Sequence, residues 1–176
     1  MTRPCPAGRL SLAIRPFTDR MPASMRIRLA DPDRDATQVS GIYGAAVEGS
    51  VASFEEIAPG ADEMAERIRG TLLRTPWLVA EDDGAAVVGY AYAAVHRERA
   101  GYRWSVDVSA YVRVDRRGRG VGRTLYDALF PMLKRQGFVN AYAGIALPNP
   151  PSVALHEALG MSCIGVYERV GFKFGA

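Results

Sequence analysis

A run of arginine and glycine residues at positions 116–124, Arg-Arg-Gly-Arg-Gly-Val-Gly-Arg-Thr, is the part of the sequence best suited to bind a ligand. Glycine lets the backbone adopt positive φ and come close to a bound group. A helix that begins after such a turn leaves amide N–H groups without partners, and its dipole favours an anion there. The run therefore predicts a phosphate-binding loop whose flanking arginines hold further phosphate oxygens.

Two common phosphate-binding motifs do not fit this run. A Walker A loop needs GxxxxGK[ST], but the position five residues after Gly118 is Arg123, and the run contains no lysine. A dinucleotide-binding turn needs GxGxxG, but Gly118, Gly120 and Gly122 alternate here, and no series of parallel βαβ units surrounds them. A solvated basic turn without a ligand stays open as an alternative interpretation.

The hydrophobic pattern around the run predicts the elements that must position it. Residues 105–114 alternate, with Val106 and Val108 on one face and Asp107 and Ser109 on the other, as in a half-buried strand. After the run, an apolar stripe indicates an amphipathic helix that ends at Gly137. We expect further strands over residues 26–29, 77–81, 86–95, 140–145 and 164–172, and further helices starting after Asp31, over residues 61–74 and over residues 149–159. This order predicts an α/β fold with a mixed sheet covered by helices.

Length and composition fit one ordinary globular domain. With 176 residues, 48% of them hydrophobic and 23% charged, the chain can bury a sizeable core without disulfides or metals. Cys5 and Cys163 lie far apart and form no CxxC pair, which predicts reduced thiols and a cytoplasmic protein. No apolar run approaches the roughly 18–20 residues that a membrane helix needs. No cluster of His, Cys, Asp or Glu has metal-ligand spacing, so neither a membrane nor a metal is expected as a partner.

The positive charge of the chain is concentrated at its beginning. Residues 1–24 carry four arginines and one aspartate, which accounts for the whole net charge of +3. This segment is rich in Pro and Arg and has no sustained periodicity, so we expect an extended or disordered arm followed by a domain over residues 25–176. Because that domain is neutral, a nucleic-acid partner is not expected.

Two motifs resemble those of a known family. The spacing Arg117-x-x-Gly120-x-Gly122 is similar to the R/Q-x-x-G-x-G/A motif of the GCN5-related N-acetyltransferases (GNAT), in which the loop binds the pyrophosphate of acetyl-CoA. Residues 147–160, LPNPPSVALHEALG, resemble the N-x-x-S-x-x-L-H-E-x-L-G element of the phosphinothricin and methionine sulfone acetyltransferase branch. Further similar stretches, such as TPWLVAE and GFKFG, extend the resemblance from about Met25 to Gly175. It implies the GNAT fold, with a mostly antiparallel central sheet flanked by helices.

The resemblance also implies where the co-substrate acetyl-CoA binds. Its pantetheine arm and thioester carbonyl are expected beside the backbone of residues 110–112, and its pyrophosphate beside residues 117–123. Asn149 is expected to contact the cofactor arm, and helix capping is its alternative role. The residues in these positions are Ala110, Tyr111, Val112, Arg117, Gly118, Arg119, Gly120, Val121, Gly122, Arg123 and Asn149.

Two side chains are candidates for proton transfer. An alkyl ammonium has a pKa of about 10, so near pH 7 it must lose a proton before it attacks a thioester. Asp107 stands where the branch has a glutamate proposed as general base. It is one methylene shorter, so a bridging water is expected. His156 stands where many members place a tyrosine that protonates the leaving thiolate. The two roles could be exchanged, and a solvent-facing Asp107 and a structural His156 remain alternatives.

The acceptor side is marked by fewer residues. Phe54 and Tyr102 match aromatic positions around the acceptor pocket of the branch, and Arg97 or Arg99 could pair with a substrate carboxylate. Ordinary loop aromatics and surface arginines are the alternative. At His96 the related proteins carry another aromatic residue, which allows a different acceptor.

The end of the chain departs from the resemblance. Related proteins continue after GFKFG with a tryptophan-containing segment and a final strand, whereas this sequence stops at Ala176. We therefore expect a fold that lacks the last C-terminal strand. The N-terminal arm or a partner subunit could fill the empty edge, which otherwise invites association, and a homodimer is expected.

Together these observations predict an N-acetyltransferase that moves the acetyl group of acetyl-CoA to the amine of a small molecule. The acceptor is expected to be an amino-acid analogue such as phosphinothricin, methionine sulfone or methionine sulfoximine, attacking directly in a ternary complex. The alternatives are acetylation of a protein or peptide amine, a nucleic-acid binder that uses residues 113–123, and a non-catalytic acetyl-CoA-binding protein.

Overall fold

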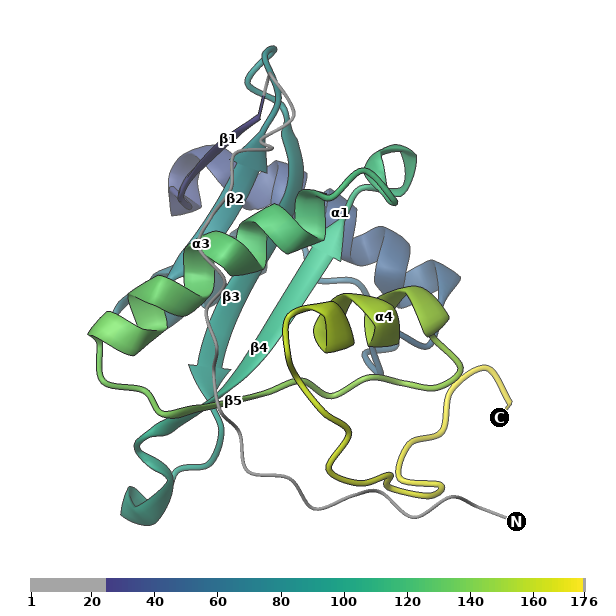
Figure 1. The fold of residues 1–176 in the computed structure, drawn as a ribbon. Coiled ribbons are helices and arrows are strands. Elements are labelled where there is room, and N and C mark those ends of the chain that lie inside the picture. Colours follow the sequence, from purple (N-terminus) through teal and green to yellow (C-terminus); the bar gives the residue numbers. More distant parts are fainter. Residues whose placement is uncertain (1–24, 176) are drawn as a thin grey trace.

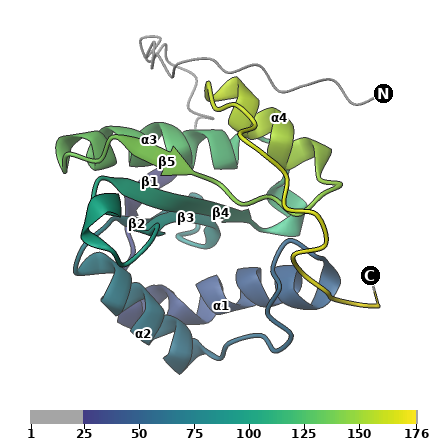
Figure 2. The ribbon, with the colours of Figure 1, turned by 90° about the horizontal axis from the view of Figure 1, so that it is seen from below.

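A computed structural model describes residues 25–175 as one mixed sheet with helices on both faces (Figures 1 and 2). The expected arm over residues 1–24 lies outside the described residues. The elements in chain order are β1 (Arg26–Leu29), α1 (Pro32–Gly49), α2 (Ala61–Leu72), β2 (Trp77–Glu81), β3 (Val87–Val95), η1 (Ala100–Tyr102), β4 (Ser105–Val112), η2 (Val114–Arg116), α3 (Val121–Arg135), β5 (Asn140–Tyr142) and α4 (Pro150–Ala158). The predicted α/β class and its mostly antiparallel sheet are confirmed.

The five strands follow one another across the sheet in sequence order. Neighbours from β1 to β4 pair antiparallel, and β5 pairs parallel with β4. In Figure 2, α1 and α2 cover one face of the sheet, while α3 and α4 lie on the other. We call these the α1–α2 face and the α3 face.

The two faces bury separate cores, as the alternation in β4 predicts. Val106 and Val108 pack on the α3 face with Leu125 and Leu129 of α3. The side chains between them, Asp107 and Ser109, therefore point to the α1–α2 face. This alternation places the polar residues of β4 opposite the helix that follows the glycine-rich loop.

β4 and β5 pair only over a short stretch. Their register runs from Ser105 opposite Asn140 to Asp107 opposite Tyr142, and β5 ends there. The sequence pattern predicted a strand as far as residue 145, but beyond Tyr142 the chain leaves the sheet. β4 continues to Val112 with β3 on its other side. The second half of β4 therefore has no paired strand on that side, and we call this missing position in the sheet the gap.

An ion-pair cluster fixes the start of α1 against the sheet. Asp31 caps the helix by accepting hydrogen bonds from the N–H groups of Asp33 and Arg34, as its position before Pro32 predicts. Inside the first turn, Asp35 is fully buried and accepts a 2.6 Å bond from Arg28 of β1. Arg28 also donates to Glu81 of β2 at 2.6 Å. One guanidinium therefore holds two buried carboxylates at the junction of β1, β2 and α1.

The predicted strand over residues 164–172 is wrong: this segment forms no strand. Its large side chains Ile164, Val166, Tyr167, Val170 and Phe172 are exposed. A strand needs a neighbour to satisfy its backbone groups, and no strand pairs with this segment. Arg169, with φ of 54°, also interrupts the extended conformation. Among the described residues, β5 is the last strand of the sheet.

A buried lysine, Lys173, anchors the C-terminal segment to the rest of the domain. Lys173 is 4% exposed, and its ammonium donates to the carbonyl oxygens of Val47, Ser53 and Glu55 at 2.5, 2.8 and 2.6 Å. These carbonyls belong to the end of α1 and the connection after it. Phe54 lies against Gly171, where an added Cβ would come within 2.4 Å of its ring. The segment thus docks on the loop between α1 and α2.

We expect Lys173→Met to lower the free energy of unfolding by about 2–4 kcal/mol, because hydrogen bonds from charged groups contribute about 1.5–3 kcal/mol each and three carbonyls lose their donor. Urea denaturation measures the change. Lys134→Met, at an exposed position in the last turn of α3, is the matched control and should change the stability by less than about 0.5 kcal/mol. Equal stabilities of the two variants would contradict this role of Lys173.

Candidate active site

The glycine-rich run forms an exposed turn that leads into α3. Gly118 and Gly120 have φ of 70° and 82°, the left-handed region that the sequence led us to expect. Gly120 is the N-cap residue, and Thr124 N–H donates to its carbonyl at 3.0 Å as the first bond of the helix. The N–H groups of Val121, Gly122 and Arg123 therefore have no partner inside the helix. With the helix dipole, they form a site suited to an anion.

The arginines of this run have different partners. Arg117 Nε donates to the Val112 carbonyl at 3.1 Å. Arg123 binds Asp127 at 2.9 Å and donates to the carbonyl of Ala158 at 3.1 Å, so it joins α3 to the end of α4. Arg119 is exposed at the tip of the turn. Arg117 is thus tied to the end of β4, and Arg119 is the arginine of this run for which the described structure shows no side-chain partner.

The edge of β4 beside the gap carries the backbone groups that were predicted to bind pantetheine. Arg113 N–H donates to the Val88 carbonyl of β3 at 3.0 Å. In an antiparallel ladder alternate residues point to opposite edges, so Val112 and Ala110 turn their N–H and C=O groups toward the gap. Tyr111 instead pairs with Tyr90 of β3, so its backbone groups point toward β3. The centroids of the two tyrosine rings are 5.4 Å apart.

Asn149 and Gly122 bring α4 close to this gap. Asn149 caps α4 by accepting a hydrogen bond from Ser152 N–H at 3.3 Å, which confirms its capping role. At Gly122 an added Cβ would lie 3.1 Å from Leu155 of α4 and 3.8 Å from Val112. The glycine therefore lets α4 approach the first turn of α3 and the end of β4.

His156 lies on the α3 face, between α4 and α3. Its Nδ1 is 2.7 Å from the carbonyl oxygen of Ser152, and its Nε2 is 3.2 Å from the hydroxyl of Tyr126. A carbonyl can only accept, so Nδ1 carries the proton and Nε2 accepts from the tyrosine. Tyr126 is fully buried, and burial raises the pKa of its hydroxyl. His156 is thus a link between two helices as well as a candidate acid.

Asp107 lies on the α1–α2 face and is bound to a residue that the sequence analysis did not assign to catalysis. His96 Nδ1 is 2.7 Å from Asp107 Oδ1. His96 follows β3 directly, and Ala94 of β3 pairs with Asp107, so the two side chains are diagonal neighbours on one face. Alternation along the two adjacent strands was only a partial signal for this contact, because it places both side chains on one face without fixing the register between the strands. The structure places Asp107 and His156 on opposite faces of the sheet.

The predicted acceptor residues divide into two groups. Tyr102 lies near His96, with ring centroids 5.9 Å apart, and the guanidinium of Arg97 is 6.0 Å from the Tyr102 ring. Arg97 and Tyr102 therefore belong to the cluster around Asp107. Phe54, 51% exposed, lies instead on the loop after α1, against the C-terminal segment.

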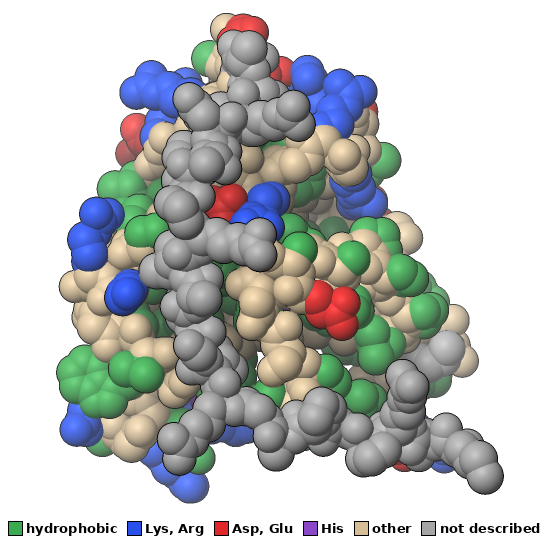
Figure 3. All heavy atoms as spheres, viewed as in Figure 1, with side chains coloured by type: hydrophobic (Ala, Val, Ile, Leu, Met, Phe, Trp, Pro, Cys, Tyr) green, Lys and Arg blue, Asp and Glu red, His purple; other side chains and the backbone are tan. Residues whose placement is uncertain are grey.

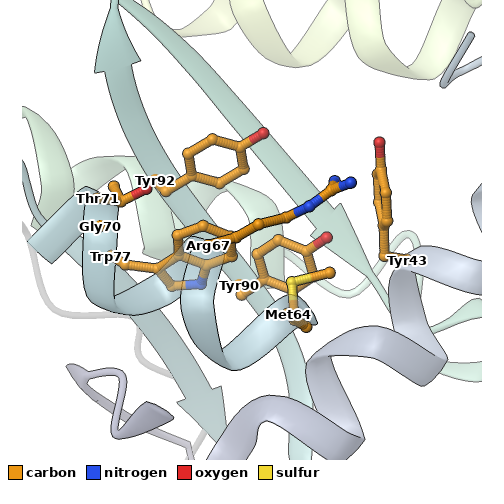
Figure 4. A pocket seen from close by; sticks show the side chains of 8 residues that line it. All are labelled: Tyr43, Met64, Arg67, Gly70, Thr71, Trp77, Tyr90 and Tyr92. Atoms are coloured by element: carbon orange, nitrogen blue, oxygen red, sulfur yellow. The ribbon is translucent and has the colours of Figure 1, made fainter. Parts of the chain in front are cut away.

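An aromatic pocket on the α1–α2 face was missed by the sequence analysis. It has a volume of about 310 Å³ and is lined by Tyr43, Arg67, Trp77, Tyr90 and Tyr92, among others (Figure 4). Figure 4 shows Arg67 extending from α2 across the pocket toward Tyr43, and Arg67 is held by Glu55 at 2.7 Å. Tyr92 pairs with Ser109, two residues from Asp107 on the same face. The alternating tyrosines of β3 were the signal for it.

The described residues offer no group of three or more His, Cys, Asp or Glu side chains that could hold a metal ion. Over the same part of the chain, none of the helices has the length and apolar character needed to span a bilayer.

Comparisons with known proteins identify the family of this chain. A family model described as the acetyltransferase (GNAT) domain matches residues 27–176. A phosphinothricin N-acetyltransferase of Streptomyces viridochromogenes is 36% identical over 157 residues, which cover 89% of this chain and 84% of that protein. An L-methionine sulfoximine/L-methionine sulfone acetyltransferase of Salmonella typhimurium is 35% identical, with coverage of 86% and 88%.

A solved structure extends the agreement to three dimensions. The crystal structure of a GNAT superfamily phosphinothricin acetyltransferase from Sinorhizobium meliloti in complex with acetyl-CoA has a TM-score of 0.82 and 37% sequence identity, with coverage of 86% of this chain and 82% of that one. The family model, the relatives and the fold together define an N-acetyltransferase. The chain belongs to the GNAT acetyltransferase family, as its motifs predicted.

Proposed function

We propose that this protein transfers the acetyl group of acetyl-CoA to the amine of a small amino-acid analogue such as phosphinothricin, methionine sulfone or methionine sulfoximine. The observation that carries the proposal is the free N–H groups at the start of α3 beside the free backbone edge of β4. The printed activities of the relatives from Streptomyces viridochromogenes and Salmonella typhimurium support the acceptor class.

The residues present fit acetyl-CoA. The N–H groups of residues 121–123 and the side chains of Arg117 and Arg119 would hold the pyrophosphate. The edge of β4 that lacks a paired strand would bind the amides of pantetheine through the N–H and C=O groups of Ala110 and the N–H group of Val112, whose C=O group accepts from Arg117. An N–H group of this edge would also stabilise the oxyanion that forms on the thioester carbonyl. When bound, acetyl-CoA supplies the activated acetyl group.

The acceptor is proposed to enter from the α1–α2 face. Asp107, Tyr102 and Arg97 gather there, and Arg97 would pair with the carboxylate of an amino-acid analogue. Phe54 contributes an apolar surface from the loop after α1. Asp107 would serve the removal of the amine proton on this face. His156, on the other face beside the Tyr126 hydroxyl, would in its protonated form deliver a proton to the departing thiolate. Attack is direct in a ternary complex.

A panel of amines tested with acetyl-CoA, read by thiol release and by mass spectrometry of the acetylated product, tests the function. The expected result is acetylation of at least one of the three amino-acid analogues. Calorimetry with coenzyme A runs beside it. Binding of coenzyme A without acetylation of any amine would overturn the proposal in favour of a non-catalytic acetyl-CoA-binding protein.

The candidate acid and the carboxylate are tested by Asp107→Ala and His156→Phe. We expect each to lower kcat by about 10²-fold, since a positioned acid or base contributes about 10²–10⁴-fold. The measurement is turnover at saturating acetyl-CoA, with calorimetric binding of coenzyme A as the control for folding. Unchanged kcat in both variants would refute both roles.

We also propose a cytoplasmic homodimer. Exposed apolar side chains of the C-terminal segment support self-association, among them Ile164, Val166 and Phe172. Figure 3 shows further apolar side chains over α4, on the right of the face in view. The use of acetyl-CoA and the absence of a CxxC pair support the cytoplasm.

A further inference from the structure

His96 and Asp107 form the one close imidazole–carboxylate pair on the α1–α2 face of the described chain. His96 Nδ1 and Asp107 Oδ1 are 2.7 Å apart, which is a short, well-formed hydrogen bond. The imidazole is 22% exposed and the carboxylate 46% exposed, so both can be reached from solvent. No other protein group described in the structure hydrogen-bonds to Nε2, the second ring nitrogen of His96.

This contact selects the tautomer of His96. A carboxylate can only accept, so Nδ1 carries the proton that lies between the two residues. In the neutral ring, Nε2 is then a lone-pair acceptor that faces away from Asp107. A carboxylate that holds an imidazole in this way also stabilises the imidazolium after the ring has taken up a proton. The pair thus has the form of a base that is oriented by a second residue.

The pair lies at the point where the sheet opens. Asp107 is opposite Tyr142 in the last pair of residues between β4 and β5. The His96 ring packs on Tyr142 with centroids 4.6 Å apart and on Tyr102 at 5.9 Å. The titratable and charged groups around His96 are thus Asp107 of β4, Tyr142 of β5, Tyr102 of η1 and, beyond Tyr102, Arg97. Two rings, from η1 and β5, and the carboxylate of Asp107 fix the imidazole beside the gap in which the thioester is proposed to lie.

Resting on the proposed function, we propose that His96 is the general base of this enzyme and that Asp107 is a positioning residue acting through it. Nε2 takes a proton from the substrate ammonium, directly or through one water. The free amine then forms the C–N bond to the thioester carbonyl carbon, and the C–S bond breaks with its electron pair on sulfur. The nitrogen releases its second excess proton as the amide forms, the thiolate takes up a proton in exchange, and the imidazolium returns the first proton to solvent. Asp107 is one methylene shorter than the glutamate of the branch, and in this proposal the His96 ring carries the basic atom beyond the carboxylate.

Two substitutions of His96 test the proposal. His96→Asn keeps a side-chain N–H that can donate to Asp107 but cannot accept a proton from an ammonium. His96→Phe keeps the ring between Tyr102 and Tyr142 but loses the bond to Asp107. We expect both to lower kcat by about 10²–10⁴-fold at pH 7, with little change in the KM for acetyl-CoA. Thermal unfolding and coenzyme A binding show whether each variant is folded.

Three readouts separate a base from a structural ion pair. The activity of both variants should rise about tenfold per pH unit between pH 7 and 9, because solvent must then supply the deprotonated amine. The activity of the wild type should rise less steeply over this pH range and reach a plateau. Added imidazole should restore part of the activity of the variants. The double variant His96→Asn/Asp107→Asn should be no slower than His96→Asn alone, because residues that act as a unit are not additive.

The outcomes are distinguishable from a failure of the proposed function. If the wild type acetylates no amine of the panel, the function itself fails. If the wild type is active and folded His96→Asn keeps kcat within about twofold with an unchanged pH profile, the assignment of His96 is overturned. If Asp107→Asn loses activity while His96→Asn does not, Asp107 itself accepts the proton.

Discussion

Replacing Gly120 by valine is expected to weaken the binding of acetyl-CoA at least about 100-fold. Gly120 has φ of 82° and is the N-cap of α3, so its conformation aims the N–H groups of the next turn. A β-branched residue is strained at positive φ and would turn the loop out of this conformation. Each lost bond to a charged group is worth about 1.5–3 kcal/mol, and misdirecting two of them accounts for the expected factor.

Isothermal calorimetry with acetyl-CoA measures this loss directly. Gly41→Val is the matched control, because Gly41 lies on an exposed position of α1 and an added Cβ there meets nothing within 4 Å. Its Kd should stay within about twofold of the wild type. A Gly120→Val protein that binds acetyl-CoA as tightly as the control would show that the loop does not hold the pyrophosphate. It would remove the observation on which the proposed function rests.

The second large effect concerns stability. Arg28→Ala should lower the free energy of unfolding by about 3–5 kcal/mol near pH 7, because removal of one partner leaves uncompensated buried charge. Asp35 and Glu81, the carboxylates that Arg28 holds, have side chains 0% and 4% exposed. Urea denaturation of both proteins measures the difference. Arg34→Ala is the matched control: Arg34 also pairs with Glu81, but its side chain is 49% exposed, so a change of about 1 kcal/mol or less is expected.

The pH dependence of this difference gives a sharper test. Burial alone would raise the pKa of Asp35, but hydrogen bonds from Arg28 and from the Asp31 backbone outweigh it, so the pKa is lowered. The pKa of Glu81 is also lowered, mainly by its hydrogen bond from Arg28. A carboxyl group with a lowered folded-state pKa stabilises the protein above its unfolded-state pKa, about 4, and loses this contribution as the pH falls further. The gap between wild type and Arg28→Ala should therefore shrink below about pH 4. A gap that stays constant down to pH 2 would contradict the ionic origin.

Local sequence signals predicted most of the fold. Asp31 before Pro32 marks the start of α1, and the alternation over residues 105–114 correctly divides β4 between the two faces. Residues 164–172 were predicted wrongly because their apolar character is that of a strand, while a strand also requires a partner along its edge. Pairing is a property of the whole sheet, and the composition of one segment does not contain it.

The local part of the site could be predicted from the sequence, whereas the contacts between strands could not. The glycine-rich loop is local, so its positive φ values and its place at the start of α3 follow from the sequence. The bond between His96 and Asp107 depends on the register of β3 against β4, which alternation alone does not determine. For the same reason the alternating tyrosines of β3 indicate only one wall of the aromatic pocket, whose other walls come from α1, α2 and β2.

The early end of β5 has a thermodynamic consequence. Half of β4 lacks a neighbour on one side, so the folded chain lacks the hydrogen bonds of a completed sheet there. A ligand whose amides dock on that side acts as an extra strand, and its binding free energy adds to the stability of the fold. Resistance to heat would then follow the supply of acetyl-CoA in the cell, and starvation for it would make this protein easier to unfold and degrade.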